Sequence, residues 1–221
     1  MQKTVAIIGK GAWGSALYHV VSQNHKKVHF LGREEICTDD IIILAVPTQS
    51  LREVGKLLQP KVKRPVIINT SKGIEQQTHQ LPREIIKEFF PDCRYFTLIG
   101  PGFAGEVTRD MPTIVNLGYG EEKDEAGDIA ALFETDTFRV RTVRAVQILE
   151  LSAALKNIYA IGCGLADGLG YEINTRTLLT VIAIEEVQKL FSALKLGVGI
   201  NSVAGTIGDL MLTCNSIESR N

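Results

Sequence analysis

Thr4-Val-Ala-Ile-Ile-Gly-Lys-Gly-Ala-Trp-Gly14 is the stretch of sequence that decides the fold. It joins a short apolar run, typical of a buried strand, to the pattern Gly-x-Gly-x-x-Gly, and the helix-like segment 15–23 follows. In this arrangement the glycines make a tight turn, admit a pyrophosphate and let the helix approach the strand. A chance glycine turn is the alternative, but the apolar run directly before the glycines argues against it. The stretch therefore predicts a dinucleotide site, with Gly9, Gly11 and Gly14 beside the phosphates at the helix amino end.

Apolar runs and helix-like segments alternate along the first two thirds of the chain. Further strands are expected over residues 28–31, 41–46, 65–69, 96–99, 113–117 and 138–141, and helices over 50–58, 81–90 and 125–133. This alternation predicts an α/β fold with a Rossmann-like, doubly wound and mostly parallel sheet. One connection is unusually short, because only residues 33–39 separate the second strand from the third. Parallel strands usually need a crossover of about ten to twelve residues, so either the crossover helix is missing or the strands pair differently.

The strand pattern stops after about residue 142. The run 145–167 is apolar at the helical period on nearly every side, which predicts a largely buried helix. A second helix is expected from Asn174 to about residue 196, and a third from Ser202 through residue 213. We therefore expect a dinucleotide-binding domain over 1–141 and an all-helical domain over 142–221.

Composition excludes several classes of protein. The chain of 221 residues has a net charge of −1, so it lacks the excess of positive charge that is typical of proteins that bind nucleic acid or a membrane surface. It shows no basic and apolar leader and no uninterrupted apolar stretch of about eighteen residues, so we expect a soluble, cytoplasmic protein. The four cysteines at positions 37, 93, 163 and 214 are dispersed, which indicates neither a disulfide framework nor a metal site.

Two lysines stand out as candidates for chemistry. Lys156 lies in the middle of the apolar run 145–167. A desolvated ammonium has its pKa lowered toward the range useful for proton transfer, although the side chain could instead reach solvent with only its stem packed. Lys72 lies in the polar turn 70–75 after a buried strand. Ligands bind at that end of the strands in open α/β sheets, and a solvated loop lysine is the alternative.

The end of the second strand bears on the choice of cofactor. Arg33 stands where NAD-specific sheets usually carry an acidic residue, and an arginine there can receive the 2′-phosphate of NADP. Glu34 and Glu35 favour NAD instead. The expected cofactor is therefore NADP or NAD.

Seven blocks of sequence, in one order from end to end, resemble a known family. They are Gly9-Lys-Gly-Ala-Trp-Gly14, Ala45-Val-Pro47, Ser71-Lys-Gly-Ile-Glu75, Gly100-Pro-Gly-Phe-Ala-Gly-Glu-Val107, Ala154-Leu-Lys-Asn157, Asp167-Gly-Leu-Gly170, and Gly208-Asp-Leu210 through Thr213-Cys214 to Ser219-Arg-Asn221. Together they resemble NAD(P)-dependent glycerol-3-phosphate dehydrogenase of the bacterial type. The resemblance implies a hydride transfer between NAD(P)H and dihydroxyacetone phosphate, which gives sn-glycerol 3-phosphate for phospholipid synthesis.

The resemblance also implies roles for individual residues. As catalytic residues it marks Lys156, the proton donor and acceptor, Lys72, which would touch substrate and cofactor, and Asp209, a carboxylate beside the catalytic lysine. Substrate contacts are implied for Lys72, Gly100, Gly102, Lys156, Asn157, Asp209, Thr213, Ser219, Arg220 and Asn221. Cofactor contacts are implied for Gly9, Gly11, Ala12, Trp13, Gly14, Arg33, Lys72, Ala104 and Arg220. The chemistry agrees, because reducing a ketone needs a proton on the oxygen as well as a hydride on the carbon.

The chain departs from this family in length and at a few positions. Members carry more residues between the second strand and Ala45-Val-Pro47, and more after Ser219-Arg-Asn221. Gly102 replaces a usual serine, and Lys10 an alanine. We expect a shortened helical domain to leave apolar surface uncovered, which predicts weak catalysis and self-association as a homodimer.

Two other functions stay open. One is a decayed, non-catalytic dinucleotide-binding module of the same fold. The other is a relative of the 3-hydroxyacid dehydrogenases, which also use a lysine near an asparagine. The ending Ser219-Arg-Asn221 favours a phosphorylated small-molecule substrate over that relative.

Overall fold

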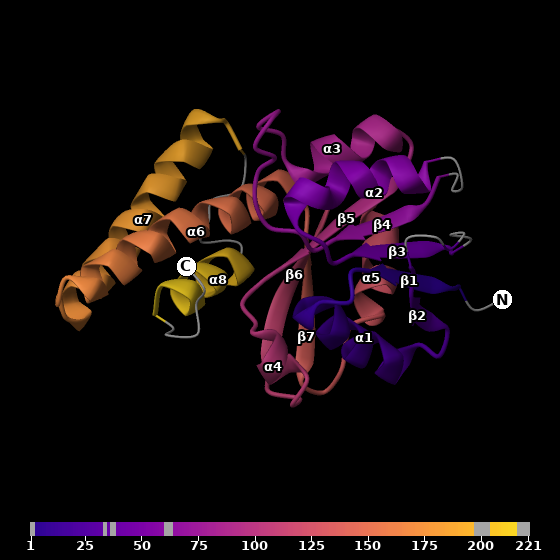
Figure 1. Ribbon diagram of the computed structural model, residues 1–221, viewed down its shortest axis with the longest axis horizontal. Coiled ribbons are helices and arrows are strands. Elements are labelled where there is room, and N and C mark those ends of the chain that lie inside the picture. The colour runs from indigo at the N-terminus through magenta and orange to yellow at the C-terminus, as the bar shows by residue number, and fades with distance from the viewer. Residues whose placement is uncertain (1–2, 33–34, 36–38, 60–63, 197–203, 216–221) are drawn as a thin grey trace.

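A single sheet forms the first part of the molecule (Figure 1). The computed structural model describes residues 3–32, 35, 39–59, 64–196 and 204–215. The strands are β1 (Val5–Ile8), β2 (Val28–Phe30), β3 (Ile41–Leu44), β4 (Val66–Asn69), β5 (Arg94–Ile99), β6 (Thr113–Tyr119) and β7 (Phe138–Val143). They lie in the order β2-β1-β3-β4-β5-β6-β7, and every neighbouring pair is parallel except β5 and β6. The predicted Rossmann-like, mostly parallel sheet is confirmed.

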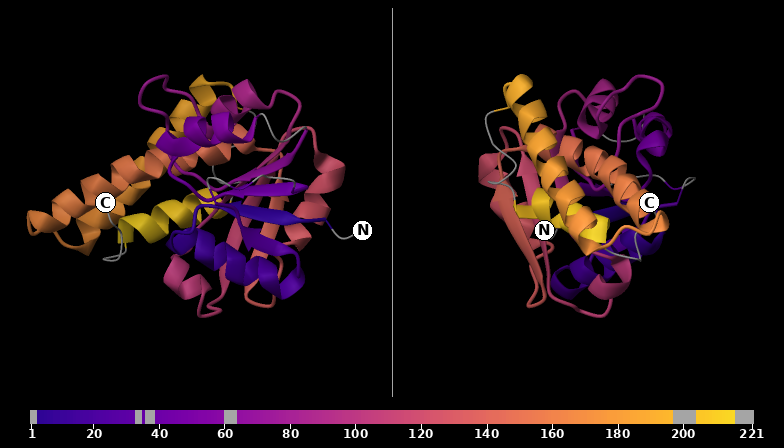
Figure 2. Two further views of the ribbon diagram at one scale, coloured as in Figure 1. Left: turned by 45° about the vertical axis from the view of Figure 1, so that its right-hand side comes forward. Right: turned by 90° about the vertical axis from the view of Figure 1, so that its left-hand side faces the viewer.

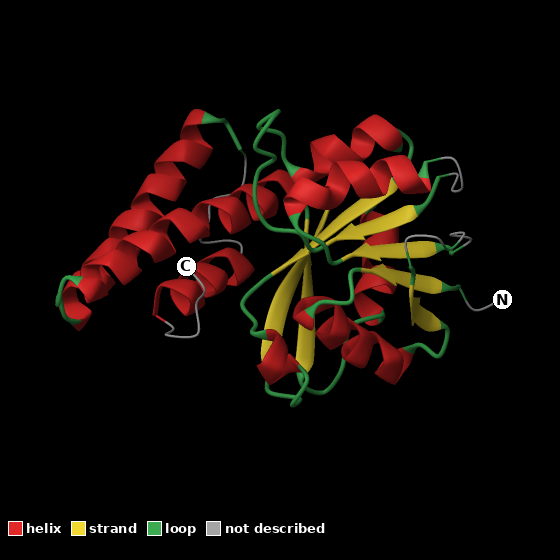
Figure 3. Ribbon diagram, in the orientation of Figure 1, coloured by secondary structure: helices red, strands yellow, loops and turns green. Residues whose placement is uncertain are grey.

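Helices cover both faces of this sheet (Figure 3). The helices are α1 (Ala12–Asn24), the 3-10 turn η1 (Thr48–Ser50), α2 (Leu51–Leu58), α3 (Pro82–Phe89), α4 (Ala104–Val107), α5 (Lys123–Ala131), α6 (Val146–Gly168), α7 (Ile173–Ala193) and α8 (Ala204–Asn215). Apolar side chains of α1 and α5 share one core cluster with the sheet, while those of α2, α3 and the start of α6 share another. The molecule therefore has a layer of helices on each side of the strands.

The central strands are apolar at every position because both of their faces are covered. In β3, Ile41 and Ile43 belong to the core on the α1 side, whereas Ile42 and Leu44 belong to the core on the α2 side. All four side chains are at most 1% exposed. Continuous apolar runs are the expected signature of such doubly covered parallel strands.

The connection after β2 joins strands that lie on either side of β1. Both β2 and β3 pair with β1 in parallel, so the alternative of a different pairing was wrong. No helix occurs among the described residues of the segment 31–40. An extended chain reaches about 3.3 Å per residue and strands lie about 4.8 Å apart. Ten residues can therefore return to the start of a four-residue strand without a helix.

The first and third glycines of the opening motif are required by close packing. Gly9 has a φ of +107°, and a Cβ atom on it would lie 2.3 Å from the carbonyl oxygen of Ala45. A Cβ atom on Gly14 would lie 1.9 Å from the carbonyl oxygen of Gly9. Gly11 has no neighbouring atom within 4 Å of that position, so the space above it is open. The turn is thus tight on the protein side and open on the ligand side.

The last part of the described chain is helical and extends away from the sheet (Figure 2). Helix α6 runs outward, α7 packs alongside it, and α8 lies between α6 and the sheet. Helix α7 begins at Ile173 with Glu172 as its N-cap, so the expected start at Asn174 was wrong. The expected third helix is α8, although Ser202 lies outside the described residues.

Helix α6 is buried on most sides in its first half, but only on one side in its second half, where Ala160, Cys163 and Ala166 are buried. Glu150, Ser152 and Ala153 are buried, but Ile158, Ile161, Leu165 and Leu169 are 59–68% exposed. The expectation of a largely buried helix was therefore wrong for the outer half, where the described residues provide no cover on that side. By length and composition α6 could cross a membrane, but a core helix meets the same criterion, and α6 packs on α7, α8 and β5.

Candidate active site

Lys72, Lys156 and Asp209 come together although they lie on three separate elements. Lys72 follows β4, Lys156 is on α6 and Asp209 is on α8. The Lys72 ammonium lies 2.6 Å from Oδ2 of Asp209, and the Lys156 ammonium lies 3.2 Å from Oδ1. One carboxylate therefore bridges two cations.

The remaining hydrogen bonds of the two ammonium groups fix their directions. The Lys156 ammonium donates to Oγ1 of Thr213 at 2.7 Å, and that hydroxyl donates to the backbone carbonyl of Asp209 at 2.6 Å. The Thr213 hydroxyl thus donates its proton to a backbone carbonyl of its own helix, and its oxygen accepts the hydrogen bond from the lysine. The Lys72 ammonium donates to the carbonyl of Gly100 at 3.3 Å.

Burial and charge act in opposite directions on Lys156. Its side chain is 11% exposed, so it does not reach out to solvent as the alternative interpretation proposed. Burial, helped by the positive charge of Lys72, lowers the pKa of Lys156 below its ordinary value of 10.5. The Asp209 carboxylate opposes this shift by stabilising the ammonium. The result is an ammonium that gives up its proton more readily than an exposed lysine.

Helix α8 is placed on the sheet by a buried asparagine and two close glycine contacts. The Oδ1 atom of Asn116, on β6, accepts a hydrogen bond from the backbone of Gly205 at 2.6 Å. A Cβ atom on Gly205 would lie 2.3 Å from that oxygen and 3.0 Å from the carbonyl of Ile99. A Cβ atom on Gly208 would lie 3.0 Å from Pro101. The close approach of α8 is what brings Asp209 to the lysines.

Gly205→Ala is expected to lower the free energy of unfolding by about 1–3 kcal/mol, because the added methyl group overpacks the contact with Asn116. Gly162→Ala is the matched control on α6, where a Cβ atom meets nothing within 4 Å. That change should instead stabilise the helix by about 0.5–1 kcal/mol. Urea unfolding of both variants measures the difference, and equal stability of the two would contradict this account of α8.

A cavity of about 540 Å³ opens beside the two lysines. The expected site residues that line it are Gly11, Ala12, Trp13, Lys72, Gly102, Ala104, Lys156, Asp209 and Thr213. The structure adds residues without an assigned role, namely Ala45, Val46, Pro47, Thr70, Ser71, Phe103 and Leu212. Most of these residues lie inside the sequence blocks quoted above. Membership in those blocks is the signal by which the sequence could have identified them.

A second cavity, of about 360 Å³, lies next to Gly9. It shares Val46 and Pro47 with the first cavity and is also lined by Gly32 and Glu35. The Glu35 carboxylate accepts a hydrogen bond from the backbone of Gly32 at 2.7 Å. Two neighbouring cavities, one lined by Gly9 and the other by Gly11, suit the two halves of a dinucleotide. Gly11 is the N-cap of α1, forms no side-chain cap, and leaves open space for a diphosphate.

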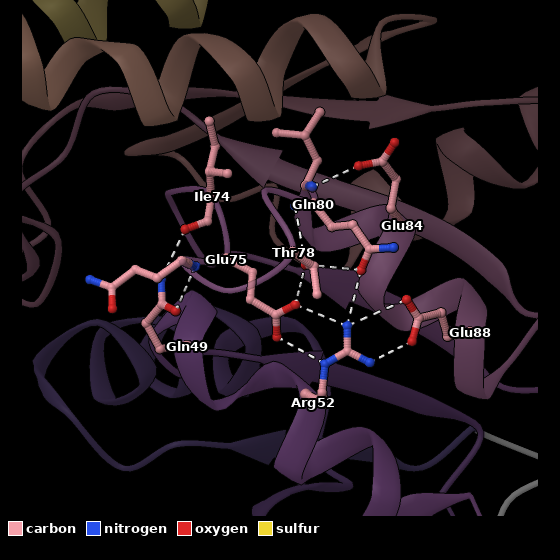
Figure 4. A network of polar contacts seen from close by, with 10 residues as sticks. Gln49, Arg52, Ile74, Glu75, Thr78, Gln80, Glu84 and Glu88 are labelled. Carbon is pink, nitrogen blue, oxygen red and sulfur yellow. Dashed lines mark hydrogen bonds and ion pairs between the residues drawn. The ribbon is translucent and has the colours of Figure 1, made fainter.

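A polar network holds the segment that follows Lys72 (Figure 4). Arg52, on α2, donates to both carboxylate oxygens of Glu75 at 3.0 and 2.9 Å and to Oε1 of Gln80 at 3.0 Å. It also pairs with Glu88 on α3. The Glu75 side chain is 6% exposed, so this network is partly shielded from water. It anchors the loop between β4 and α3 to both neighbouring helices.

Not every expected site residue lines these cavities. Gly14 is packed beneath Gly9, and Gly100 contributes its carbonyl to Lys72. Asn157 follows Lys156 on α6 and is not among the residues that line the larger cavity. Four further candidates, Arg33, Ser219, Arg220 and Asn221, lie outside the residues that the structure describes.

Comparisons with known proteins agree with this arrangement. The family model of the N-terminus of NAD-dependent glycerol-3-phosphate dehydrogenase matches residues 33–125, and the model of its C-terminus matches residues 146–221. The glycerol-3-phosphate dehydrogenase [NAD(P)+] of Halalkalibacterium halodurans is 34% identical, over 99% of this chain and 74% of the relative. That match runs over 258 positions, which exceeds the 221 residues of this chain by 37. The relative therefore has residues inside the matched stretch that this chain lacks.

Solved structures share the fold. The glycerol-3-phosphate dehydrogenase of Coxiella burnetii superposes with a TM-score of 0.87 at 24% identity, covering 99% of this chain and 78% of that one. The Saccharomyces cerevisiae enzyme of the same name superposes with a TM-score of 0.81 at 20% identity, covering 98% of this chain and 78% of that one. With the sequence match across the whole chain, the protein belongs to the NAD(P)-dependent glycerol-3-phosphate dehydrogenase family, whose members are oxidoreductases.

Proposed function

We propose that this protein reduces dihydroxyacetone phosphate to sn-glycerol 3-phosphate, with NADH or NADPH as the reductant and phospholipid synthesis as the use of the product. The observation that carries the proposal is the pair of ammonium groups on Asp209 at the wall of the larger cavity. A phosphorylated ketone is a small anion, and two cations beside a cofactor-sized space suit it. The family membership supports the same reaction.

In this proposal Lys156 is the general acid. The nicotinamide, when bound, supplies the hydride that adds to the carbonyl carbon of the substrate. As the carbonyl oxygen becomes an alkoxide, the Lys156 ammonium stabilises its negative charge and then transfers a proton to it. The lysine is left neutral and regains a proton from solvent. In the reverse direction the neutral amine accepts the proton of the alcohol.

Lys72 and Asp209 prepare the site for that transfer. Asp209 counteracts the effects of burial and of Lys72, and so keeps Lys156 protonated. Lys72 is 27% exposed and faces the cavity, where we assign it to the substrate and the cofactor. By family resemblance, Ser219, Arg220 and Asn221 would bind the substrate phosphate, for which the planar donor fork of an arginine is well suited. Arg33 and the lining residue Glu35 would decide between NADP and NAD.

A kinetic assay beside a binding titration tests the proposal. Oxidation of NADH and of NADPH is followed with dihydroxyacetone phosphate, and with a 3-keto acid as the competing substrate. Turnover with the phosphorylated ketone alone supports the proposed reaction. Turnover with the keto acid would favour a 3-hydroxyacid dehydrogenase, while cofactor binding without any turnover would favour the decayed, non-catalytic module.

The pKa of Lys156 predicts opposite pH dependences for the two directions. Ketone reduction needs the protonated lysine, so its rate should fall as pH rises through the lowered pKa, below 10.5. Alcohol oxidation needs the neutral amine, so its rate should rise through the same pH range. Steady-state rates in both directions across a pH series measure this. A common fall in both directions above neutral pH would instead indicate unfolding.

We also infer a homodimer formed through the exposed face of α6 and α7. That face includes Leu165, 64% exposed, and Leu178, 57% exposed. Covering a few hundred Å² of such surface is worth several kcal/mol, at about 25 cal/mol per Å². Sedimentation of the wild type should give twice the chain mass of 24.2 kDa. Leu165→Glu should give the single chain mass, while Met111→Glu, an exposed apolar position on the sheet side, should leave the dimer intact.

We further propose a cytoplasmic location and a functional division at 141, between a cofactor domain and a helical substrate domain. The buried free thiols Cys93, Cys163 and Cys214 are compatible with a reducing compartment. In the structure β7 ends at Val143 and α6 begins at Val146, so the proposed division falls two residues before the end of the last strand.

A further inference from the structure

Glu150 is a buried carboxyl group that the proposed reaction does not use. It lies on α6, six residues before Lys156, and is 1% exposed. A carboxyl group removed from water is costly unless hydrogen bonds compensate for the lost solvation. Its partners therefore show which parts of the fold depend on it.

Three elements donate hydrogen bonds to Glu150. The hydroxyl of Tyr95, on β5, donates to Oε1 at 2.5 Å, and the backbone of Arg83, in the first turn of α3, donates to Oε2 at 3.1 Å. The side-chain amide of Asn69, at the end of β4, donates to Oε1 at the longer distance of 3.5 Å. The first two bonds fix the position of the Glu150 carboxylate, so its negative charge attracts the Asn69 amide in one direction.

Asn69 connects Glu150 to the turn that carries Lys72. It is fully buried, and its Oδ1 accepts a hydrogen bond from the backbone of Ser71 at 3.0 Å. Its Nδ2 donates to the carbonyl of Ser71 at 3.3 Å and also faces Glu150. Ser71 is followed in the chain by Lys72, whose ammonium donates a hydrogen bond to the Asp209 carboxylate. A continuous path of contacts thus leads from Glu150 through Asn69 and Ser71 to the site.

We propose that Glu150 is a positioning residue, whose ionised carboxylate orients Asn69 and thereby sets the turn that presents Lys72. When Glu150 takes up a proton, it loses the charge that attracts the Asn69 amide, and the long contact weakens first. Lys72 is then held less tightly against Asp209 and the cavity. For its kinetic consequence this inference rests on the proposed dehydrogenase function.

The charge of Glu150 changes in the neutral range. Burial raises the pKa of Glu150 to about 7, against the opposing effects of Tyr95 and Arg83. Burial also raises the pKa of Tyr95 well above its ordinary value, so Tyr95 stays a neutral donor at that pH. The charged residue that acts on Glu150 is Arg83 on α3, and its positive charge lowers the pKa of the carboxyl group. Cys93, near Tyr95, also has a raised pKa because of burial.

A purely structural role makes a different prediction. If Glu150 only satisfies Tyr95 and the first turn of α3, then Glu150→Gln alters stability and leaves Lys72 unaffected. The test therefore needs a signal from Lys72 itself. Reductive methylation with 13C-labelled formaldehyde gives each lysine an NMR resonance, and Lys72→Arg identifies the one from Lys72.

In the wild type the Lys72 resonance should show an inflection near pH 7, and kcat/KM for dihydroxyacetone phosphate should fall as pH falls through the same value. In Glu150→Gln both features should disappear. Above pH 7 kcat/KM should also be about tenfold below the wild type, since misplacing a binding group by about 1 Å costs up to 10²-fold. Tyr95→Phe removes the bond that favours the carboxylate, so both inflections should move to higher pH.

Glu125→Gln is the matched control, because Glu125 pairs with Arg94 next to Tyr95 but has no contact with this path. It should behave as the wild type does. An inflection of Lys72 that survives in Glu150→Gln, or that is absent from the wild type, overturns the proposal. If Glu150→Gln does not fold, an unmoved inflection in Tyr95→Phe overturns it equally. Because the NMR signal needs no turnover, failure of the proposed function would show separately, as a folded protein that does not reduce the substrate.

Discussion

Lys156→Ala is expected to lower turnover of dihydroxyacetone phosphate by about 10²–10⁴-fold, the range for loss of a positioned proton donor. The affinity for NADH should change little, because the glycine turn and the smaller cavity stay intact. The structure supplies the reason for a large effect. Lys156 is nearly buried, is held between Thr213 and Asp209, and has a lowered pKa. Among the described residues, no other ammonium combines these features.

Single-turnover and steady-state rates separate the two parts of this prediction. Cofactor affinity is measured by fluorescence titration, and the chemical step by the decay of NADH after rapid mixing. Lys189→Ala, an exposed lysine on the neighbouring helix α7, serves as the control and should keep wild-type rates. Turnover of Lys156→Ala within a few-fold of the wild type would remove Lys156 from the mechanism. Loss of cofactor binding in that variant would point to a structural role instead.

Asp209→Asn is expected to lower turnover at neutral pH by on the order of 10²-fold, because it removes the negative charge beside the ammonium groups of Lys72 and Lys156. The asparagine keeps the volume of the side chain but no longer neutralises the ammonium groups at 2.6 and 3.2 Å. Lys72 and burial both lower the pKa of Lys156, and Asp209 is the carboxylate that opposes them. Without it the pKa of Lys156 should fall further, so that less of the enzyme carries the proton it must donate.

The pH profile distinguishes this cause from a simple loss of structure. In Asp209→Asn the alkaline fall of the reduction rate should move to lower pH, and lowering the pH should recover part of the activity. Lys72→Met in the same background removes the repelling charge, so it should move the inflection back up. The two changes therefore shift the inflection in opposite directions, and the double variant should lie between the wild type and Asp209→Asn. An unshifted inflection in Asp209→Asn, or one that Lys72→Met does not move back up, would refute the electrostatic role of Asp209.

Local patterns in the sequence were enough to predict the fold class. The run from Thr4 to Gly14 combines an apolar strand with glycines that no other residue can replace. A Cβ atom on Gly9 or Gly14 would lie only 2.3 or 1.9 Å from a backbone oxygen. The period of apolar residues located the strands and helices to within a few residues. Lys156 and Lys72 were recognised as candidates because a lysine in an apolar helix, or at a strand end, is unusual enough to call for an explanation.

Periodicity could not decide what covers a helix. The run 145–167 is apolar all round, which is equally consistent with a helix buried on every side and with one that leaves a face uncovered. The structure has both, in the two halves of α6. In the same way, the short segment after β2 left two strand pairings open, and only the position of β1 between β2 and β3 distinguished them.

By itself, the sequence determined the α/β class, the nucleotide-binding turn and the two candidate lysines, because these depend on residues that are neighbours in the chain. The tertiary structure alone decided which distant groups meet. Lys72 and Asp209 are 137 residues apart, Asn116 and Gly205 are 89 apart, and Asn69 and Glu150 are 81 apart. Such contacts depend on strand order and on how closely a helix docks, neither of which leaves a periodic pattern in the sequence. Asp209 could be marked by resemblance, but the buried Glu150 emerged only when α6, β4 and β5 were seen to pack together.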